Sequence, residues 1–575
     1  MQKTIISIGH TQARLAVLAA IVAACNGDST RPLAPSSNNT PTALQSTGAV
    51  SNARDRLIHW ETLSDDSLWA AIARSDSIAD VGLKFPTQRY GMDARGRVLL
   101  SVKERGVAAQ AVREVADVQL LSEDALLPIA RVRVRSVEAL RSLRTHSYVS
   151  YVEPGAFVSD GARGIWSSGS SGCSVGAYAG PAGSTTIAPG DVVPWNYNYM
   201  GIPLAWNRVG GGPGVTIGIV DTGVDYWQPE LNALFAAGMS TGRSFTKDAT
   251  SASSGPAPWH DDCGHGTRMA SVIGAPRNGQ SIVGVAWQAN LYSVRVDNDV
   301  LLTNVSATRL GIRSAATNAK IIAMAFGTVA YYSSIADEIL YWYGYDKLFF
   351  AAAGTSFCRN PLQGVVTFPG NLSTVTTVTG LDPNGLIACN SHFGPEVDFA
   401  AYVDQPATGL ASLGSQLAGF GGSSDATGVL AGIAALSLSG RPSATRADIL
   451  GDLQVAAAPT GYRSPTIGWG APNAVCAVRA MCTAYVNGPS LIQTIGTRSY
   501  TWTFGQSNSP GPFRYQWSTG ETTPSMSRSI SVWKGMTEYD ITLSVTVTDL
   551  SSGATTSPIT KVVTVRDPQG CPTCT

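Results

Sequence analysis

The 575-residue sequence has little charge and no long apolar run. Charged residues make up 14% of it, and 40 basic residues balance 40 acidic ones, so the formal net charge is zero. Proteins that bind nucleic acid usually carry a basic excess or stripe, so this balance argues against that class. No apolar run reaches the roughly 18–20 residues of a membrane-spanning helix, which argues against an integral membrane protein.

Histidine is also scarce. Only six histidines are present, and no H-E-x-x-H pattern occurs, which argues against a metallopeptidase. Length is ample by contrast. At about 150 residues per domain, the chain is expected to hold three or four units.

The N-terminus has the pattern of a targeting segment. Lys3 and Arg14 flank "LAVLAAIVAAC", an apolar stretch that is too short to span a membrane and ends in small residues. Its end, "VAAC", resembles the lipobox of bacterial lipoproteins, which implies acylation of Cys25. A plain secretory signal with an incidental cysteine is the alternative, and both predict export. Residues 26–50 have too little apolar content to fold, so we expect a polar tether.

Of the nine cysteines, eight remain once Cys25 is set aside. An even number in an exported chain favours disulfides over metal sites. The sequence does not fix the pairing, because eight cysteines allow about 105 connectivities. The pairs that we expect are Cys476–Cys482, Cys571–Cys574, Cys358–Cys389 and Cys173–Cys263.

Residues 97–155 alternate strand and helix signals, which we interpret as a small βαββαβ unit. Residues 51–90, which precede it, look partly helical. The elements expected within the unit are a strand over 97–102, a helix over 108–118, a strand over 127–134, a helix over 136–146 capped by Ser136, and a strand over 148–154.

Residues 156–192 are rich in glycine and serine, which predicts a linker or exposed loop. The motif "GCSVG" at 172–176 matches the nucleophile elbow of α/β-hydrolases. That elbow needs a strand before it and a helix after it, and the sequence predicts neither, so we interpret the match as chance.

Residues 195–482 form the large unit. Apolar strands separated by helical stretches predict a mostly parallel α/β sheet that is buried on both faces. The strands are expected within 214–220, 289–296, 320–327, 348–354 and 374–380.

Residues 483–570 alternate apolar and polar residues with period two between turns. This pattern indicates an all-β sandwich of immunoglobulin-like type, with Trp517 in its core.

The stretch "FGGSSDATGVLAG" at 420–432 places two serines at the start of a helical run. Serine is a common helix N-cap, so capping alone would explain them. As a nucleophile, Ser424 would have its own backbone N–H and the positive end of the helix dipole beside the developing anion. Ser423 is better explained as a turn residue. A nucleophile also needs a base and an orienting acid from elsewhere in the chain.

Two other residues qualify for those roles. Asp221 ends the apolar strand "VTIGIVD", at the carboxyl end where catalytic groups of open α/β sheets collect. His265 opens a helical stretch and stands between two glycines that allow close backbone approach. Taken alone, Asp221 could cap a turn and His265 could be structural. Of the other histidines in the unit, His260 lies in a loop and His392 has no comparable setting.

These elements occur in the order Asp, His, Ser, which is the order of the subtilisin triad. With "DTGVD", "GHGTRMASVIGA" and "GGSSDATGVLAG" in place, residues 195–480 resemble the subtilisin-like serine peptidase family (subtilases). The unit at 97–155, especially "ALRSLRTHSYVSYVEP", resembles the inhibitory propeptide of that family. The resemblance implies an α/β fold with a mostly parallel sheet flanked by helices.

The resemblance also implies roles for the three residues. Asp221 would orient the imidazole and stabilise the imidazolium. His265 would take the proton of Ser424 and pass it to the leaving amine. Ser424 would attack the carbonyl and form an acyl-enzyme.

One position departs from the family pattern. The family has an asparagine that completes the oxyanion hole, and here "AAAGTS" places Thr355 there. Three outcomes are open: Thr355 donates, a neighbour such as Ser356 or a water substitutes, or the enzyme is slow. Asp425 and Gly428 also stand where the family often has methionine and proline. A carboxylate at 425 would disfavour the oxyanion unless it points away.

For substrate, "MAFG" at 324–327 resembles the family segment whose backbone pairs with the substrate chain. Ala325 and Gly327, with Ala352–Gly354, would line the pocket before the scissile bond and leave room for sizeable apolar side chains. "VDNDV" at 296–300 offers carboxylates for a structural calcium ion, but a solvated acidic loop is the simpler interpretation. We expect no required cofactor.

The sequence thus favours an exported serine endopeptidase made as a zymogen, with its own propeptide as intramolecular inhibitor, protein or peptide substrates, no nucleic acid partner and a lipid anchor at Cys25. The alternative, raised by Thr355 and Asp425, is a catalytically weak subtilase scaffold that acts as an envelope binding protein. The expected domains are a lipoprotein-type signal peptide (1–25), a tether (26–50), a propeptide (51–158), a linker (159–194), the peptidase domain (195–482) and an immunoglobulin-like β-sandwich (483–575).

Overall fold

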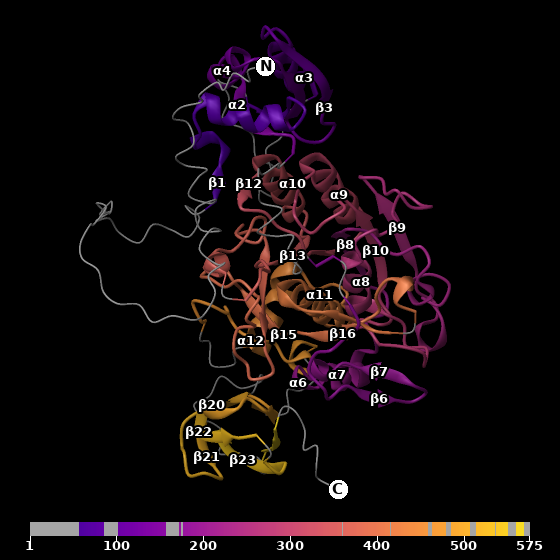
Figure 1. The fold of residues 1–575 in the computed structure, drawn as a ribbon, viewed down its shortest axis with the longest axis vertical. Coiled ribbons are helices and arrows are strands. Elements are labelled where there is room, and N and C mark those ends of the chain that lie inside the picture. The colour runs from indigo at the N-terminus through magenta and orange to yellow at the C-terminus, as the bar shows by residue number, and fades with distance from the viewer. Residues whose placement is uncertain are drawn as a thin grey trace, which may run out of the picture.

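The computed structural model shows three units that follow one another along the long axis of the molecule (Figure 1). They hold elements β1 to β5, β6 to α13 and β18 to β24 respectively. Within the described ranges, no helix combines the length and apolar character that a membrane crossing needs. The residues described are 57–84, 102–156, 172–173, 176–358, 360–414, 416–457, 463–478, 485–505, 513–534, 536–549 and 559–567.

The middle unit is built on a seven-stranded sheet in which every neighbouring pair is parallel. All five strands expected from the apolar runs are present in it, so the prediction of a mostly parallel α/β sheet is confirmed. In spatial order, the strands are β15 (Phe399–Tyr402), β14 (Thr376–Leu381), β13 (Leu348–Ala352), β11 (Ile321–Met324), β8 (Thr216–Asp221), β10 (Asn290–Arg295) and β9 (Phe245–Ala249).

Helices cover both faces of this sheet, which is why its inner strands β8, β11 and β13 are almost wholly apolar, whereas the edge strand β9 is only partly buried. Ile217 and Ile219 of β8 share one core with α8 and α11, while Val220 shares the other core with α9 and α10. The helix α11, which begins with the two serines, is buried over almost its whole length. The helices are α6 (Trp195–Tyr199), α7 (Ile202–Val209), α8 (His265–Gly274), α9 (Val305–Asn318), α10 (Ser333–Tyr343), α11 (Gly422–Gly440), α12 (Arg446–Ala457) and α13 (Ala474–Ala477).

Short strands and 3₁₀ turns complete the middle unit. Residues 176–194, expected to be linker, hold the antiparallel hairpin of β6 and β7, so that part of the prediction is wrong. Glycines of this segment, which contributed to the linker prediction, lie in the turns around this hairpin instead. The elements are β6 (Thr185–Ile187), β7 (Asp191–Val193), η4 (Pro229–Leu231), η5 (Gly238–Ser240), β12 (Ala330–Tyr331), η6 (Pro361–Gly364), β16 (Gln405–Ala407), η7 (Ala411–Leu413) and β17 (Ala418–Phe420).

The N-terminal unit is a four-stranded antiparallel sheet with the order β3-β4-β2-β5 and three helices. The helix expected at 136–146 is confirmed, and Ser136 caps it by accepting a hydrogen bond from the N–H of Ala139. The elements are β1 (Ile58–His59), η3 (Trp60–Thr62), α2 (Asp65–Arg74), β2 (Ile78–Leu83), α3 (Val102–Arg113), β3 (Val118–Glu123), β4 (Ile129–Val134), α4 (Val137–Thr145) and β5 (Val149–Pro154).

The first strand of the four-stranded sheet differs from the expected one. It is β2, and Val102, the last residue of the expected strand 97–102, begins helix α3. The rest of that expected strand lies outside the described residues. The sequence hides β2 because Asp80 interrupts its apolar run. Asp80 is buried and accepts hydrogen bonds from Arg131 at 2.9 and 3.0 Å, so it fits a central strand.

The N-terminal unit contacts the middle unit through paired backbone and buried polar groups. Strand β1 pairs with β12. The carboxylate of Glu153 accepts hydrogen bonds from the N–H groups of Ser333 and Ser334 in the first turn of α10, at 2.7 and 3.0 Å. Tyr151 donates to Asp337 at 2.9 Å. A carboxylate at a helix N-terminus satisfies backbone donors that the helix leaves free.

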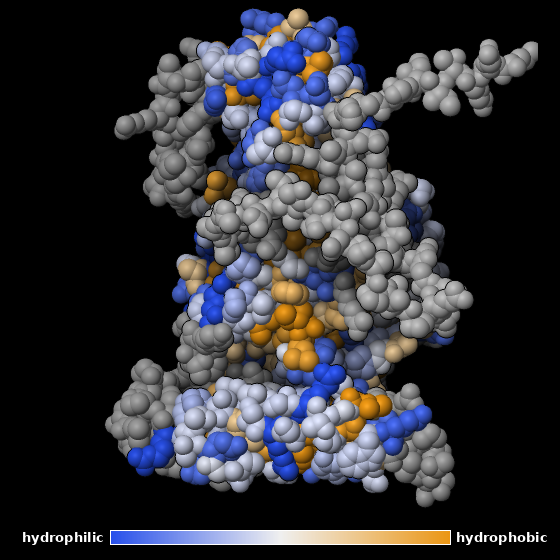
Figure 2. Space-filling model, turned by 60° about the vertical axis from the view of Figure 1, so that its left-hand side comes forward, coloured by the Kyte–Doolittle hydropathy of each residue, from blue (hydrophilic) through white to orange (hydrophobic). Residues whose placement is uncertain are grey.

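The C-terminal unit consists of two sheets around one apolar core that contains Trp502 and Trp517. The predicted burial of Trp517 is confirmed. On the face that Figure 2 shows, its surface is mostly polar with isolated apolar areas. The strands are β18 (Tyr485–Asn487), β19 (Leu491–Ile492), β20 (Gly496–Gly505), β21 (Phe513–Trp517), β22 (Ser525–Val532), β23 (Tyr539–Asp549) and β24 (Ile559–Val565).

Two of the expected disulfides are present: Cys173–Cys263 and Cys358–Cys389. Cys476 is also disulfide-bonded. Its expected partner Cys482, the expected pair Cys571–Cys574, the signal segment and the tether lie outside the described residues.

Candidate active site

Asp221 and His265 form a buried pair at the carboxyl edge of the sheet. Asp221 is the last residue of β8 and His265 is the first residue of α8. Nδ1 of His265 lies 2.8 Å from Oδ1 of Asp221, and the two residues are 2% and 3% exposed. The N–H of Thr222 also donates to that oxygen, at 2.8 Å. Because Nδ1 faces the carboxylate, the tautomer with a proton on Nδ1 is favoured and Nε2 is an acceptor.

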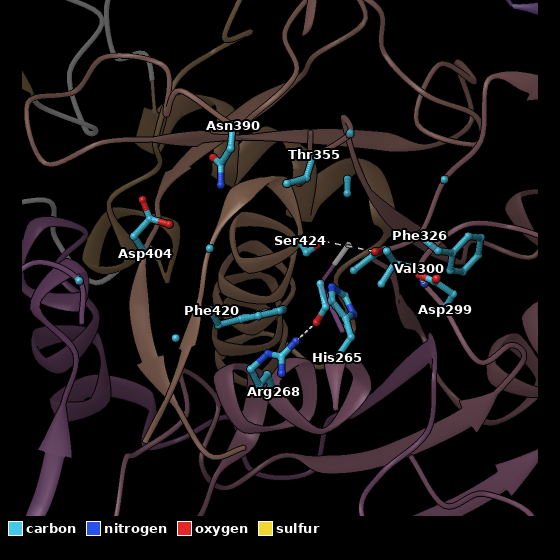
Figure 3. Close-up of a pocket in the computed structure, with 18 of the residues that line it drawn as sticks. His265, Arg268, Asp299, Val300, Phe326, Thr355, Asn390, Asp404, Phe420 and Ser424 are labelled. Atoms are coloured by element: carbon cyan, nitrogen blue, oxygen red, sulfur yellow. Dashed lines mark hydrogen bonds between the residues drawn. The ribbon is translucent and has the colours of Figure 1, made fainter. Parts of the chain in front are cut away.

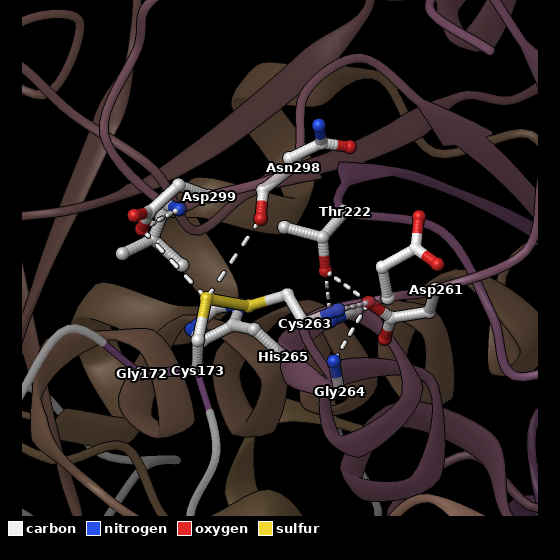
Figure 4. The surroundings of a disulfide bond; sticks show 12 residues. Gly172, Cys173, Thr222, Asp261, Cys263, Gly264, His265, Asn298 and Asp299 are labelled. Atoms are coloured by element: carbon white, nitrogen blue, oxygen red, sulfur yellow. Dashed lines mark hydrogen bonds between the residues drawn. A yellow bond between two sulfur atoms is a disulfide. The ribbon is translucent and has the colours of Figure 1, made fainter. Parts of the chain in front are cut away.

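A second aspartate, which the sequence reasoning did not single out, holds the start of α8 in place. Asp261 accepts hydrogen bonds from the N–H of Gly264 at 2.7 Å and from both the N–H and the hydroxyl of Thr267. It also accepts from the hydroxyl of Thr222, which itself accepts from the N–H of Gly266 (Figure 4). This network fixes the helix start against the end of β8. The signal that could have identified it is the spacing of "DDCGHGT", in which an aspartate precedes a helix start.

Ser424 lies in the first turn of α11 and lines the same cavity as His265. It is 7% exposed, and its hydroxyl donates to the carbonyl of Ala325 at 3.3 Å (Figure 3). Within the described residues, no hydrogen bond joins this hydroxyl to His265. Catalytic hydrogen bonds are often long before substrate binds, so the geometry is compatible with a nucleophile and its base.

The cavity has a volume of about 490 Å³. Of the residues expected to line the pocket before the scissile bond, Ala325, Gly327, Ala352 and Gly354 line the cavity, whereas Ala353 is fully buried and does not. The backbone of Gly327, however, is already paired. Its N–H donates to the carbonyl of Val300 at 3.0 Å, and its carbonyl accepts from the N–H of Leu302 at 3.1 Å. A substrate chain that pairs with Gly327 must therefore separate it from the segment 300–302.

Thr355 lies in the cavity, and its hydroxyl is bonded to Ser423 rather than free. It accepts from the N–H of Ser423 at 3.1 Å and lies 3.0 Å from the Ser423 hydroxyl. The Ser423 hydroxyl donates its own proton to the carbonyl of Gly354 at 2.7 Å. The hydrogen bond between the two side chains is therefore donated by the Thr355 hydroxyl. To stabilise an oxyanion, Thr355 must first give up this bond. Ser423 thus braces the turn before Ser424, as the sequence indicates.

Asp425 points away from the cavity, which answers the question raised by its position beside Ser424. It is fully buried and accepts hydrogen bonds from the N–H of Asp404 and from the side chain of Gln405. Burial raises the pKa of Asp425 well above its usual value. Burial thus disfavours the charged form of this carboxyl, and its hydrogen bonds hold it beneath the helix start, away from the cavity.

The remaining histidines of the unit serve the structure. His392 is buried and bonds through its two ring nitrogens to the carbonyl of Val365 and the hydroxyl of Ser356. His260 accepts a hydrogen bond from the N–H of Tyr226. In the acidic segment 296–300, Asp297 accepts from the N–H groups of Thr303 and Asn304 ahead of α9.

The segment around Gly172 covers one edge of the imidazole. The disulfide Cys173–Cys263 ends two residues before His265 (Figure 4). A Cβ on Gly172 would lie 2.7 Å from Cδ2 and 3.5 Å from Nε2 of His265, so only glycine fits there. Arg268 donates to the carbonyl of Gly172. Ser174 of the "GCSVG" motif lies outside the described residues.

The fold and the site define an α/β protein with a buried aspartate–histidine pair beside a serine at a helix start. Residues 212–470 match the model of the Subtilase family. The chain is 29% identical over 354 residues to a thermostable alkaline protease of Halalkalibacterium halodurans, a match covering 61% of this chain and 83% of that protein. It is also 29% identical over 290 residues to Subtilisin Savinase of Lederbergia lenta (50% and 99%) and 26% identical over 424 residues to Alkaline elastase YaB of a Bacillus species (71% and 98%). Residues 212–470 are thus similar to subtilases, and the chain is a serine endopeptidase.

Proposed function

We propose that the protein cleaves peptide bonds through a triad of Asp221, His265 and Ser424 and an acyl-enzyme intermediate. The observation that carries this proposal is the 2.8 Å contact between His265 and Asp221, with Ser424 lining the same cavity. A buried carboxylate that faces Nδ1 leaves Nε2 to accept a proton from a serine hydroxyl.

The proposed reaction has two stages. As the hydroxyl of Ser424 turns from the carbonyl of Ala325 to Nε2 of His265, the oxygen attacks the substrate carbonyl and His265 takes the proton. His265 then donates that proton to the leaving amine as the peptide bond breaks and the acyl-enzyme remains. In the second stage, water gives a proton to His265, attacks the ester and releases the acid, while the proton returns to Ser424.

The oxyanion is proposed to be stabilised mainly by the start of α11. The N–H of Ser424 and the positive end of the helix dipole supply one donor and a favourable field. Thr355, the residue that the family pattern places at the second donor position, contributes only after it gives up its bond with Ser423. Water or Thr355 then completes the site.

We further propose that residues 51–158 act as the propeptide, so that the enzyme is made as a zymogen. Support comes from the ion pairs that join the N-terminal unit to α9. Asp124 accepts hydrogen bonds from Arg309 and from Arg313, the latter at 2.9 Å. Although burial opposes it, the guanidinium of Arg309 lowers the pKa of Asp124 to about 2, so this contact persists to low pH. The C-terminal unit is proposed to be an immunoglobulin-like binding domain.

Export is proposed from the N-terminal segment, and one relative, of Bacillus subtilis, bears the name "Minor extracellular protease Epr". A lipid on Cys25 would anchor the chain on the far side of the propeptide from the peptidase domain. Cleavage between the two would detach the enzyme unless the parts stay bound. Fractionation of envelope and medium with an antibody to the C-terminal unit tests this, and a membrane-bound, full-length active species would contradict it.

The test of the catalytic proposal is labelling of the full chain with a fluorophosphonate probe, together with casein hydrolysis and the N-terminal sequence of the active species. Wild type is expected to be labelled, and Ser424→Ala to be unlabelled and inactive. Ser423→Ala is the matched control and should still be labelled. If wild type reacts with no probe, the alternative of a subtilase scaffold that only binds its partners replaces this proposal.

A further inference from the structure

We propose that Asp404 selects a lysine or arginine side chain at the first or second residue after the scissile bond. The inference rests on the proposed function, because that function defines which part of the cavity holds the leaving group. Asp404 follows β15, and within the sequence it belongs to none of the motifs that indicated catalysis.

Asp404 lines the same cavity as Ser424 and His265. The pocket that holds the acyl part of the substrate is lined by Ala325 and Gly327, with Val300 and Phe326 beside it. Figure 3 shows Asp404 on the other side of Ser424 from Val300 and Phe326. A substrate that crosses Ser424 from the acyl pocket therefore brings its leaving part towards Asp404.

The carboxylate of Asp404 lies directly over the turn that precedes α11. Its Oδ1 occupies the space that a Cβ on Gly421 would need, so a side chain at position 421 would displace the carboxylate. Position 421, the first glycine of the "GGSS" run, therefore requires glycine because there is no room for a side chain. Its backbone conformation does not require glycine, since a φ of −157° is extended.

Hydrogen bonds fix the backbone that aims this carboxylate. The carbonyl of Asp404 accepts from the hydroxyl of Tyr178 at 3.1 Å and from the indole N–H of Trp195 at 3.0 Å. Its N–H donates to Asp425 at 3.1 Å. The residue holds a φ of +69°, which non-glycine residues adopt rarely. Side chains from three separate segments thus hold Asp404 in one strained conformation.

The carboxylate itself has no partner. Among the described residues, none donates a hydrogen bond to it and none forms an ion pair with it. Arg268, whose guanidinium also lines the cavity, donates instead to the carbonyl of Gly172. An anion that is partly removed from water without a partner is unfavourable, and a substrate cation would restore the lost interaction.

The surroundings of the carboxylate suit a long cationic side chain. Residues 177–181 line this part of the cavity, held in place by pairing between Ala177 and Ala418 and by the hydrogen bond from Tyr178 to Pro181. Together with Phe420, they present apolar surface beside the carboxylate. Lysine and arginine place an apolar stem against such surface while the charged end reaches an acceptor.

The experiment compares internally quenched peptides that differ only at the two positions after the scissile bond, with lysine, alanine or glutamate there. For wild type, kcat/KM is expected to be about ten- to a hundredfold higher for lysine than for alanine, the range of a hydrogen bond to a charged group. Asp404→Asn keeps the shape and tolerates the positive φ, and it should bring this ratio close to one.

Two controls keep the outcomes distinct. A peptidyl p-nitroanilide has no peptide on its leaving side, so wild type and Asp404→Asn should hydrolyse it equally, which also reports correct folding. Asp382→Asn removes a neighbouring charge that does not line the cavity and should preserve the lysine preference. If the nitroanilide is hydrolysed but wild type shows no lysine preference, or Asp404→Asn retains it, the inference is wrong and the proposed function stands. If neither substrate class is hydrolysed, the proposed function itself fails.

A pH profile gives a second readout. Burial, and to a smaller extent the charge of Asp382, raises the pKa of Asp404 to about 6. The other titratable groups packed against it are Asp425 and Tyr178, and burial raises the pKa of both. The lysine-to-alanine ratio should therefore be full at pH 8 and fall as the pH drops through 6, with no such trend in Asp404→Asn.

Discussion

Two aspartate–histidine pairs lie close together among the described residues of the peptidase unit, and of their four side chains only that of His265 lines the cavity. In the first, Nδ1 of His265 is 2.8 Å from Asp221; in the second, Nδ1 of His260 is 3.6 Å from Asp225. The N–H of Tyr226 donates to Nδ1 of His260, so that nitrogen is an acceptor and cannot also donate to Asp225. The same two residue types thus give a proton-transfer pair in one place and a structural contact in the other. The partner of Nδ1 makes the difference.

The largest expected difference between the pairs comes from removing each imidazole. His265→Ala should lower kcat by about 10⁶-fold, the magnitude known for the corresponding loss in subtilisin. His260→Ala should leave kcat close to wild type, because its ring packs edge-on against Trp227 outside the cavity. Hydrolysis of a peptidyl p-nitroanilide at saturation measures both. Equal losses in the two variants would contradict the assignment of roles.

A smaller difference is expected from the two carboxylates. Asp221→Asn should lower kcat by about 10⁴-fold, because an amide there favours the wrong tautomer of His265. Asp225→Asn should leave kcat near wild type but cost about 1–3 kcal/mol of stability, because Asp225 accepts hydrogen bonds from the N–H groups of Trp227 and Ala411. Denaturant unfolding beside the kinetic assay separates the two effects. A kinetic loss in Asp225→Asn as large as that in Asp221→Asn would refute the distinction.

The smallest effect on rate is expected at Thr355. Loss of an oxyanion-hole donor costs about 10²–10³-fold in kcat. Because the Thr355 hydroxyl is bonded to Ser423, Thr355→Val should cost less than about tenfold, with Thr355→Ser as the variant that retains the hydroxyl. A loss of a hundredfold in Thr355→Val that Thr355→Ser restores would instead make Thr355 a full donor, as the family pattern suggests.

The sequence predicted the features that depend on local patterns. Continuous apolar runs located five of the seven strands of the parallel sheet but not its edge strands β9 and β15. The motifs around Asp221 and His265 located a pair that the fold brings into contact. Strand β2 was missed because its buried Asp80 is recognisable only with its partner Arg131, which lies 51 positions along the chain. Asp404 was missed for a related reason. Its ability to bind a substrate cation depends on the hydrogen bonds from Tyr178 and Trp195 and on the space above Gly421, none of which a local sequence pattern reveals.

The disulfide between Cys173 and Cys263 closes a covalent ring of chain that contains strand β8 and Asp221. The proposed export would expose the enzyme to other proteases, and a single nick anywhere in that ring would leave its two fragments joined. Damage of this kind would be invisible on a non-reducing gel and would appear as two bands only after reduction. The carboxylate partner of His265 is thus retained by a second connection to the rest of the molecule, independent of the peptide backbone.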